Sequence, residues 1–317
     1  MAILLLFIVN GHRNLLLERI CRVKISLDCF PCFLRQALEA SRISGAGEET
    51  QREVMDRVMA KLLDISREET PPQIGSMIHE TIRKATGNSD PYREIKHRHN
   101  EQALAMAEEL TALITGSASP LSDALKLAAA GNLIDMGPER KWNEMRDIFR
   151  DFTRKDPTHF DYASFEKALG KAGTLLYLGD NAGEIVLDKI LIGVLLRETN
   201  LDITYVVRGG PVINDATMED ARFVGMTDLA RVIDTGTAFP GVVPDASSRK
   251  FLDYYLGADM ILSKGQGNYE SLSDEEKNIF FLLQAKCPVI AGKIGCGVGD
   301  MVLKPQRGDS AMKREVE

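Results

Sequence analysis

The sequence has few cysteines, no excess of positive charge and no long hydrophobic run. Its five cysteines in 317 residues are an odd and sparse set, so they do not make a disulfide framework. A net charge of −7 disfavours a protein whose main partner is nucleic acid, because such proteins are usually basic. The apolar run over residues 1–9 is too short to span a bilayer. These absences indicate a globular protein of a reducing cytoplasm, with no nucleic-acid or membrane partner.

The two ends of the chain differ in pattern from the rest. Residues 1–23 lack the basic region and the small-residue cleavage site of a signal peptide. We interpret them as an extension from a misassigned start, with Val23 as the initiator; the alternative is a short strand or helix docked on the domain. Residues 306–317 are polar and without periodicity, which predicts a tail.

Between the ends, the sequence divides into two regions. Apolar residues at helical spacing predict an all-helical domain over residues 24–170. Short β-rich runs that alternate with helices predict an α/β domain with a mainly parallel sheet over residues 171–305. In the first region the expected helices are 33–40, 49–63, one from residue 71, 92–115, 120–134, 144–152 and 165–172. In the second the expected strands are 174–178, 203–207, 231–234, 260–263, 289–291 and 301–303, and the expected helices are 185–197, 216–224, 247–256 and 274–285.

Acidic and amide side chains follow two of the expected strands directly. Asp180 and Asn181 lie between the strand over 174–178 and a helix, and Asp215 follows the next strand. An Asp-Asn pair also suits a simple turn that caps a helix. The carboxyl ends of parallel strands, however, meet at one edge of a sheet, where such folds bind ligands. Oxygen donors at neighbouring strand ends predict a site for a hard divalent cation such as Mg²⁺ or Mn²⁺, and disfavour a thiolate zinc site.

Basic and glycine-rich segments follow the same strands. Arg208 stands at the end of the second strand, and Lys264 is followed by Gly265, Gly267 and Asn268. Glycines let backbone N–H groups approach an anion, and a lysine adds a point charge. The loop fits neither the Walker pattern nor the dinucleotide fingerprint. It is interpreted as a phosphate cradle, with a flexible loop and a solvated lysine as the alternative.

A Cys-x-x-Cys motif at Cys29 and Cys32 precedes a helix in the all-helical region. A thioredoxin-type motif would instead follow a strand, and a zinc site would need a second pair of ligands. A structural role, metal binding and thiol chemistry all stay open for these residues. His97 and His99 are two residues apart on an expected helix and point to different sides, which favours solvated or packing roles.

Six short motifs occur in one order between about residues 24 and 304. Together they resemble the damage-control phosphatase family with the ARMT-like domain, in its prokaryotic branch with a Cys-x-x-Cys motif. The motifs are Asp28-Cys29-x-x-Cys32, Asp90-Pro91-Tyr92, Gly131-Asn132-x-Ile134-Asp135, Gly179-Asp180-Asn181-Ala182-Gly183-Glu184, Asn214-Asp215-Ala216-Thr217 and Lys264-Gly265-x-Gly267-Asn268.

The resemblance implies a three-layer α/β/α, Rossmann-like domain after an all-helical domain. It implies a metal held by Asp180, Asn181 and Asp215, with manganese, cobalt, nickel or magnesium supporting activity. Lys264 matches a phosphate-contacting lysine of the family. The implied activity is hydrolysis of small phosphomonoesters, such as sugar phosphates or damaged phosphometabolites.

The leading hypothesis is therefore a metal-dependent phosphatase. Water attacks phosphorus in line, Lys264 with Arg208 offsets the charge of the phosphoryl oxygens, and Glu184 or another nearby acid orients the water. Substrate binding is assigned to Asn132 and, with Arg208 and Lys264, to the glycine-rich loop residues Gly265, Gly267 and Asn268.

Two other functions compete with this hypothesis. A non-catalytic protein that binds a phosphometabolite or nucleotide would use the same loops without hydrolysis. A methyltransferase on a doubly wound sheet would need an acidic residue at the end of the second strand, and Arg208 at that position counts against it.

Overall fold

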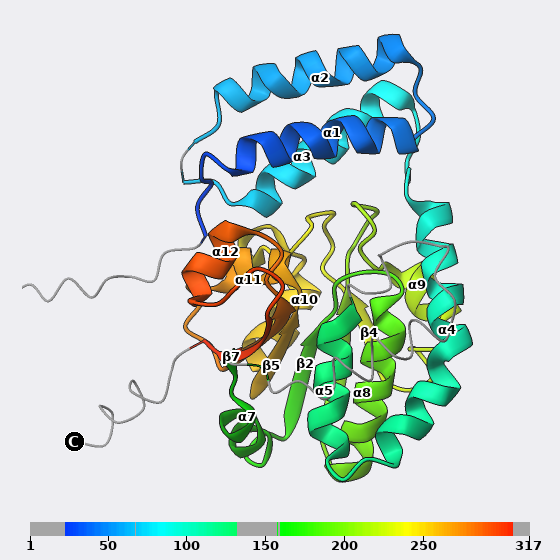
Figure 1. Ribbon diagram of the computed structural model, residues 1–317, viewed down its shortest axis with the longest axis vertical. Helices are drawn as coiled ribbons and strands as arrows, with labels where there is room; N and C mark the ends of the chain where they lie inside the picture. The colour runs from blue at the N-terminus through cyan, green and yellow to red at the C-terminus, as the bar shows by residue number, and fades with distance from the viewer. Residues whose placement is uncertain (1–22, 67, 132–156, 158, 307–317) are drawn as a thin grey trace, which may run out of the picture.

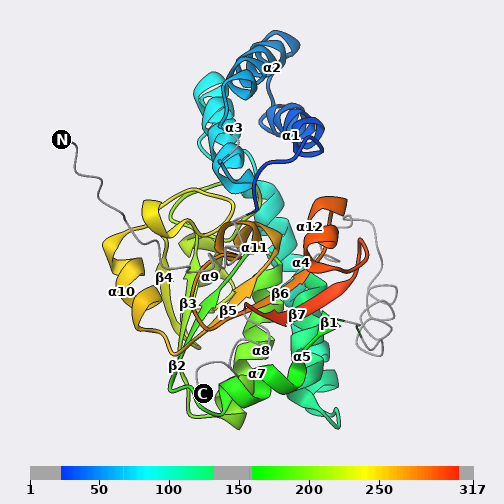
Figure 2. The same ribbon diagram turned by 90° about the vertical axis from the view of Figure 1, so that its left-hand side faces the viewer.

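A computed structural model of the chain describes residues 23–66, 68–131, 157 and 159–306. In these residues a layer of helices lies above a seven-stranded sheet, which has further helices on both faces (Figures 1 and 2). The predicted fold class, an α/β protein with a mainly parallel sheet, is confirmed.

The helices, in chain order, are α1 (Cys29–Ile43), α2 (Glu48–Leu63), α3 (Pro71–Thr86), α4 (Arg93–Thr115), α5 (Pro120–Ala129), α7 (Tyr162–Leu169), α8 (Glu184–Glu198), α9 (Met218–Phe223), α10 (Arg249–Gly257), α11 (Gln266–Leu272) and α12 (Pro288–Ile294). The strands are β1 (His159–Phe160), β2 (Thr174–Leu178), β3 (Asp202–Val207), β4 (Arg231–Asp234), β5 (Met260–Lys264), β6 (Ile279–Gln284) and β7 (Met301–Pro305).

The strand order of the sheet reverses at β2. The sheet runs β1-β7-β6-β5-β2-β3-β4. From β2 the chain continues outward through β3 and β4, then returns to the other side of β2 to add β5 and β6, all parallel. Only β7 runs antiparallel to its neighbour β6. The carboxyl ends of β5, β2 and β3 therefore meet at the point where the strand order reverses, and open α/β sheets bind ligands there.

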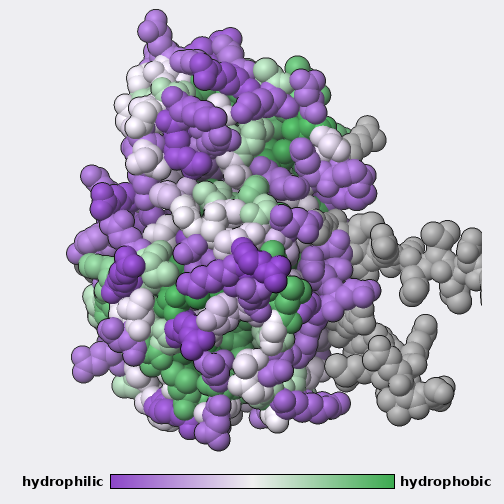
Figure 3. Space-filling model, turned by 180° about the vertical axis from the view of Figure 1, so that it is seen from behind, coloured by the Kyte–Doolittle hydropathy of each residue, from purple (hydrophilic) through white to green (hydrophobic). Residues whose placement is uncertain are grey.

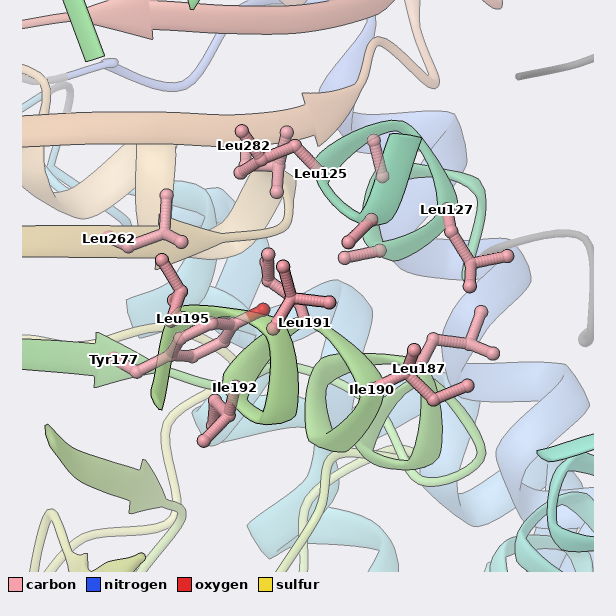
Figure 4. Packing of buried hydrophobic residues seen from close by; sticks show 14 of the residues in the cluster. Leu125, Leu127, Tyr177, Leu187, Ile190, Leu191, Ile192, Leu195, Leu262 and Leu282 are labelled. Atoms are coloured by element: carbon pink, nitrogen blue, oxygen red, sulfur yellow. The ribbon is translucent and has the colours of Figure 1, made fainter. Parts of the chain in front are cut away.

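Helix α8, which begins shortly after β2, is a main packing element of the core. Ten of its fifteen residues are buried, because it lies between the sheet and helices α4 and α5. Figure 4 shows Leu195 next to Tyr177 of β2 and Leu262 of β5, while Leu187 faces Leu127 of α5. A helix that is hydrophobic on all sides is expected only where neighbours cover it completely, and this covering fixes the start of α8 beyond the carboxyl end of β2.

Helices α1, α2 and α3 form a separate hydrophobic core above the carboxyl edge of the sheet. Arg83 of α3 donates to the carbonyl oxygen of Pro211 at 2.8 Å, and Gly75 lies so close to Pro240 that an added Cβ would be 2.8 Å from its Cγ. Helices α4, α5 and α7 instead share the core of the sheet. The packing thus divides the helices of residues 24–170 into two groups, where the sequence predicted one helical domain.

Two elements near the C-terminus differ from the prediction. The helix predicted over 274–285 is wrong, because residues Ile279–Gln284 form β6. A short apolar run buried on both faces does not distinguish a strand from a helix by its period. The strand predicted over 289–291 is also wrong, since these residues belong to α12. Pro288 opens this helix at its first position, where proline is tolerated, and this outweighs the β propensity of Val289 and Ile290.

Several other predictions concern residues outside those that the structure describes. The helix over 144–152, Asn132 and most of the predicted extension and tail lie outside them. Val23, the last residue of the predicted extension, is described and fully buried, and its backbone N–H donates to the carbonyl oxygen of Glu270 at 3.2 Å. The short strand β1 lies in the region where only helices were expected.

Among the described helices, none is long and apolar enough to cross a membrane. Seen from behind, hydrophobic residues gather on the lower part of the surface, below the mainly hydrophilic helical layer (Figure 3). A cavity of about 150 Å³ opens at the amino ends of β2 and β3, lined by Thr174, Leu176 and Tyr254 among others. It lies at the opposite end of these strands from the loops that carry Asp180 and Asp215.

Replacement of Leu191 by alanine tests the packing of α8. Leu191 is fully buried in the main core, so Leu191→Ala should lower the free energy of unfolding by about 2–5 kcal/mol. Leu196 on the same helix is 37% exposed, and Leu196→Ala should cost clearly less. Urea unfolding of the two variants and the wild type measures both effects. Equal losses would contradict this packing of the helix.

The buried imidazole of His79 predicts a pH dependence of stability. His79 is 2% exposed, its Nε2 has no hydrogen-bond partner among the described residues, and its ring lies 5.9 Å from that of Tyr92. Burial, with the nearby charge of Arg83, lowers the pKa of His79 to about 4. Between pH 6.5 and 4 the unfolded chain therefore binds more protons than the folded one, so acid destabilises the fold.

The corresponding loss is on the order of 3 kcal/mol over this range. His79→Phe keeps a ring at this position but cannot be protonated. The free energy of unfolding of the variant, measured in urea from pH 4 to pH 8, should fall less steeply below pH 6.5 than that of the wild type. If the free energy of unfolding fell equally with pH in both proteins, the lowered pKa of His79 would be contradicted.

Candidate metal and phosphate site

Backbone hydrogen bonds join the loop after β2 to β3 and to the loop that follows β3, and one more closes that second loop. The donors and acceptors are Gly179 N to Val206 O (3.0 Å), Ala182 N to Asn214 O (2.8 Å), Ala216 N to Asp180 O (2.8 Å) and Arg208 N to Ala216 O (2.9 Å). Asn181 and Asp215 form an isolated antiparallel bridge within this network. The network places the predicted residues Asp180, Asn181 and Asp215 side by side, although helix α8 and strand β3 separate them in the sequence.

A strained residue precedes Asp215. Ile213 has a φ of +45°, which β-branched residues rarely adopt. Its side chain packs against the core of α1, α2 and α3, and this contact holds the loop in its conformation. Residues in such conformations tend to occur at functional sites. Nothing in the sequence pattern marked this position.

Arg208 joins the two acids of the site. Its Nε lies 2.6 Å from Oδ2 of Asp215, and its Nη2 lies 3.3 Å from Oδ1 of Asp180. All three residues are buried, with Arg208 only 1% exposed. The third nitrogen, Nη1, is buried and has no hydrogen-bond partner among the described residues. A buried guanidinium nitrogen without an acceptor is costly, so this atom is a donor available to water or to an anionic ligand.

The acids of the site are held close together in a buried place. Burial, together with the charges of Asp215 and Glu184, raises the pKa of Asp180 to about 7, although the charge of Arg208 opposes the rise. Burial also raises the pKa of Asp215, against the attraction of Arg208. One guanidinium thus compensates the carboxylates only in part, and their ionised forms need further positive charge.

The donor chemistry of these residues fits a divalent cation. Arg208 uses Oδ2 of Asp215 and Oδ1 of Asp180, and Nδ2 of Asn181 lies 3.4 Å from Oδ2 of Asp180. Oδ1 of Asp215 and a lone pair on Oδ2 of Asp180 stay available to a ligand. With the side-chain oxygen of Asn181, these are donors that Mg²⁺ and Mn²⁺ accept. The described residues contain no group of three or more His, Cys, Asp or Glu side chains arranged for a metal; the three predicted ligands are two carboxylates and an amide.

Lys264 lies at the end of β5, next to the acids, and is held by two carboxylates of α8. Its Nζ is 3.2 Å from Oε2 of Glu184 and 2.9 Å from Oδ1 of Asp188. Burial alone would lower the pKa of this ammonium group, but the charges of Asp188 and Glu184 raise it above its usual value. Lys264 therefore stays charged, and two of its three N–H donors are in use.

Asp188 was not found from the sequence. It is fully buried and accepts hydrogen bonds from the hydroxyl groups of Tyr177 at 2.7 Å and Tyr205 at 2.8 Å, as well as from Lys264. The sequence feature that could have revealed Asp188 is its position, four residues after Glu184 in an otherwise apolar helix. This spacing places both side chains on one face of the helix.

Glu184 connects Lys264 to the residues of the candidate metal site. Its Oε1 accepts a hydrogen bond of 3.0 Å from Nδ2 of Asn181, which leaves the amide oxygen of Asn181 for another partner. Gly131, after α5, lies against Glu184, since an added Cβ would be 2.5 Å from its Cγ. The predicted substrate-binding residue Asn132 follows Gly131 but lies outside the described residues.

The glycine-rich segment after β5, predicted as a loop, forms the start of helix α11, with Gly265 just before the helix and Gly267 and Asn268 inside it. An added Cβ on Gly265, whose φ is +79°, would lie 1.9 Å from Oδ2 of Asp180, and one on Gly267 would lie 2.1 Å from the carbonyl oxygen of Pro240. The amide of Asn268 donates to the carbonyl oxygens of Gly179 and Lys264. Its own oxygen accepts the N–H of residue 242. These contacts give Asn268 a positioning role, and only Gly265 directly borders the acids.

Hydrogen bonds that the sequence did not predict also connect helix α4 to the start of α8. Asn100 accepts the backbone N–H of Gly183 at 2.7 Å and donates to Asp220 at 2.9 Å. Lys96, one turn earlier on α4, is buried and pairs with Asp90 at 2.8 Å and Asp220 at 3.6 Å. The sequence feature that could have revealed this contact is the spacing of Lys96 and Asn100, two polar residues four apart on one face of an amphipathic helix.

The cysteine and histidine motifs lie elsewhere. Cys29 and Cys32 stand in the first turn of α1, where Cys29 Sγ is 3.6 Å from the hydroxyl of Ser26. The described contacts of these two cysteines include none with the acids of the site. His97 is exposed and lies 3.4 Å from Glu101, whereas His99 is buried.

The chain is similar in sequence to known proteins over nearly its whole length. A family model described as "Damage-control phosphatase ARMT1-like domain" matches residues 25–302. A protein of Archaeoglobus fulgidus named damage-control phosphatase is 34% identical over 294 residues, which cover 89% of this chain and 99% of that protein. The damage-control phosphatase PH1575 of Pyrococcus horikoshii is 33% identical over 287 residues, with 88% and 97% covered.

A solved structure agrees with these matches. The crystal structure of a DUF89 family protein from Pyrococcus horikoshii superposes with a TM-score of 0.85 at 30% identity, covering 90% of this chain and 99% of that one. The family match includes every described residue of the site, from Asp180 to Lys264. This chain belongs to the damage-control phosphatase ARMT1-like domain family.

Proposed function

We propose that this protein is a metal-dependent phosphatase that hydrolyses small phosphomonoesters, such as sugar phosphates or damaged phosphometabolites. The observation that carries the proposal is the buried group of Asp180, Asn181 and Asp215 around Arg208, whose Nη1 has no partner among the described residues. Such a group suits both a cation and a phosphate oxygen. The names of the relatives, damage-control phosphatases, support the same reaction.

Asp180, Asn181 and Asp215 would hold the cation, with manganese, cobalt, nickel and magnesium as candidates. A divalent ion so bound supplies an activated water and offsets charge on the phosphoryl group. Both carboxylates are already held in place by Arg208, and the Asn181 amide is oriented by Glu184. The ligands are therefore arranged before the ion arrives, which lowers the entropic cost of binding.

The remaining residues act on the phosphate and on the attacking water. Nη1 of Arg208 and the third N–H of Lys264 are donors for phosphoryl oxygens. Glu184 borders both Asn181 and Lys264, so its carboxylate is placed to orient the water for in-line attack. Gly265 keeps this space open next to Asp180.

Substitution of the acids tests the catalytic assignment. Asp180→Asn and Asp215→Asn keep the shape of each side chain but remove its charge, and each should lower kcat/KM by about 100-fold or more. Phosphate release from p-nitrophenyl phosphate and from a panel of phosphosugars, with each of the four metals, measures the effect. Asp253→Asn on the exposed side of α10 is the control and should keep wild-type activity.

Full activity in both acid variants would contradict the proposed site. A wild-type protein that binds a phosphoester saturably but releases no phosphate would support the alternative, a non-catalytic phosphometabolite-binding protein.

Metal removal provides an independent test. A chelator should abolish phosphate release, and readdition of an effective ion should restore it. Because the ion binds the folded state only, it should also stabilise the protein by about 2.7 kcal/mol at a concentration of 100 times its Kd. Thermal unfolding with and without the ion should show this gain in the wild type but not in Asp215→Asn. An equal gain in both would place the ion elsewhere.

A further inference from the structure

The structure gives the two thiols of the Cys-x-x-Cys motif a common position in the helical layer above the sheet (Figure 1). Cys29 is the first residue of α1, and Cys32 follows it in the same turn. Both are free thiols. Side chains at this spacing share one face of a helix, with Cβ atoms about 5–6 Å apart. No strand directly precedes the motif, so its chemistry depends on the start of the helix alone.

The start of α1 suits a disulfide between these two residues. A disulfide needs Cβ atoms about 3.5–4.5 Å apart, so the pair must approach by about 1–2 Å. Side chains three residues apart come closer in a 3₁₀ turn, which is common at helix ends. The N–H groups of Cys29 and Phe30 already form bonds of this kind, to the carbonyl oxygens of Ser26 and Leu27 at 3.1 and 3.2 Å. Pro31, between the cysteines, has no N–H to lose.

The surroundings of the two thiols differ. Cys32 is exposed, whereas Cys29 is half-buried. Nη2 of Arg35 lies 3.9 Å from Sγ of Cys32, and the hydroxyl of Ser26 lies 3.6 Å from Sγ of Cys29. Accessible cysteines beside a guanidinium at a helix start are those that react as nucleophiles. An external reagent therefore meets Cys32 first, and Cys29 lies behind it.

Two other described cysteines provide a contrast. Cys287 and Cys296 are half-buried and pack against the core on one face of the sheet. Burial and the charge of Asp300 raise the pKa of Cys296, which keeps this thiol protonated and unreactive. Of these four cysteines, only Cys32 is exposed.

A metal site is the alternative use of such a motif. A structural zinc ion needs four ligands. Within the ranges that the structure describes, no third His, Cys, Asp or Glu side chain joins Cys29 and Cys32 in a group that could hold a metal. The arrangement of the two thiols thus favours thiol chemistry.

We propose that Cys29 and Cys32 form a redox-active dithiol, which a low-molecular-weight disulfide such as glutathione disulfide converts to an intramolecular disulfide. The thiolate of Cys32 attacks the external disulfide, which forms a mixed disulfide and releases one thiol. Sγ of Cys29, as a thiolate, then attacks Sγ of Cys32 and releases the second thiol. The protein loses two electrons and two protons, and the reagent is reduced to two thiols. The inference does not depend on the proposed function.

Peptide mapping of the full-length protein tests the disulfide. Cleavage after Lys24 and Arg35 gives the peptide 25–35, which contains Cys29 and Cys32 and no other cysteine. After incubation with glutathione disulfide this peptide should have lost two hydrogen atoms, and dithiothreitol should restore them. A peptide that stays reduced, or one that is instead linked to Cys21, would overturn the inference. A zinc ion that protects both thiols in the purified protein would also overturn it.

Serine variants test the order of the two steps. Cys29→Ser should stop at a mixed disulfide on Cys32, whereas in Cys32→Ser the thiol of Cys29 should react about tenfold more slowly. Cys296→Ser is the control and should form the same disulfide at the wild-type rate. Modification of Cys29 as fast as that of Cys32 would contradict the assigned order. Thermal unfolding should show wild-type stability in the reduced variants.

Neither measurement uses phosphate release. A protein that hydrolyses no phosphoester but forms the disulfide would overturn the phosphatase proposal and support this inference. A phosphatase whose peptide 25–35 stays reduced would do the reverse.

Discussion

The site depends on the buried ion pairs that Arg208 forms with Asp180 and Asp215. Arg208 comes from the end of β3, and its partners come from the loops after β2 and β3. Removing one member of such a buried group leaves an uncompensated charge, which typically costs about 3–5 kcal/mol. The guanidinium therefore keeps two acids together that would otherwise repel each other. Its remaining nitrogen has no partner among the described residues, and the carboxylate oxygens beside it are of the kind that divalent cations accept.

Packing outside the site maintains this arrangement. Helix α8 begins at Glu184 beside the acids and is buried along its length, so its first turn cannot move independently of the core. Asn100 of α4 fixes Gly183 just before this turn. The core of α1, α2 and α3 contacts Ile213 in the loop that carries Asp215. Both the sheet core and the helical layer thus hold the polar groups, which is how rigid elements usually support a site on loops.

The sequence predicted well those features that depend on local pattern. The strands β2 and β3 and the residues that follow them were correctly placed, because apolar runs followed by Asp, Asn and Gly have few other interpretations. Residues 279–291 were misread, since the run of β6 has no distinguishing period and its identity as a strand depends on pairing with β5 and β7. Asp188 and Asn100 were missed because single polar residues in helices acquire a role only from what they pack against.

The sequence by itself determined the fold class, the family motifs and the oxygen-rich chemistry of Asp180, Asn181 and Asp215, because residue type and spacing along a strand-loop-helix unit are local properties. Tertiary structure decided how the charges are distributed. It buried Arg208 and Lys264 among carboxylates, most of which are distant from them in the sequence. These pairings depend on the order of the strands, because parallel strands distant in the sequence become neighbours only in the folded sheet.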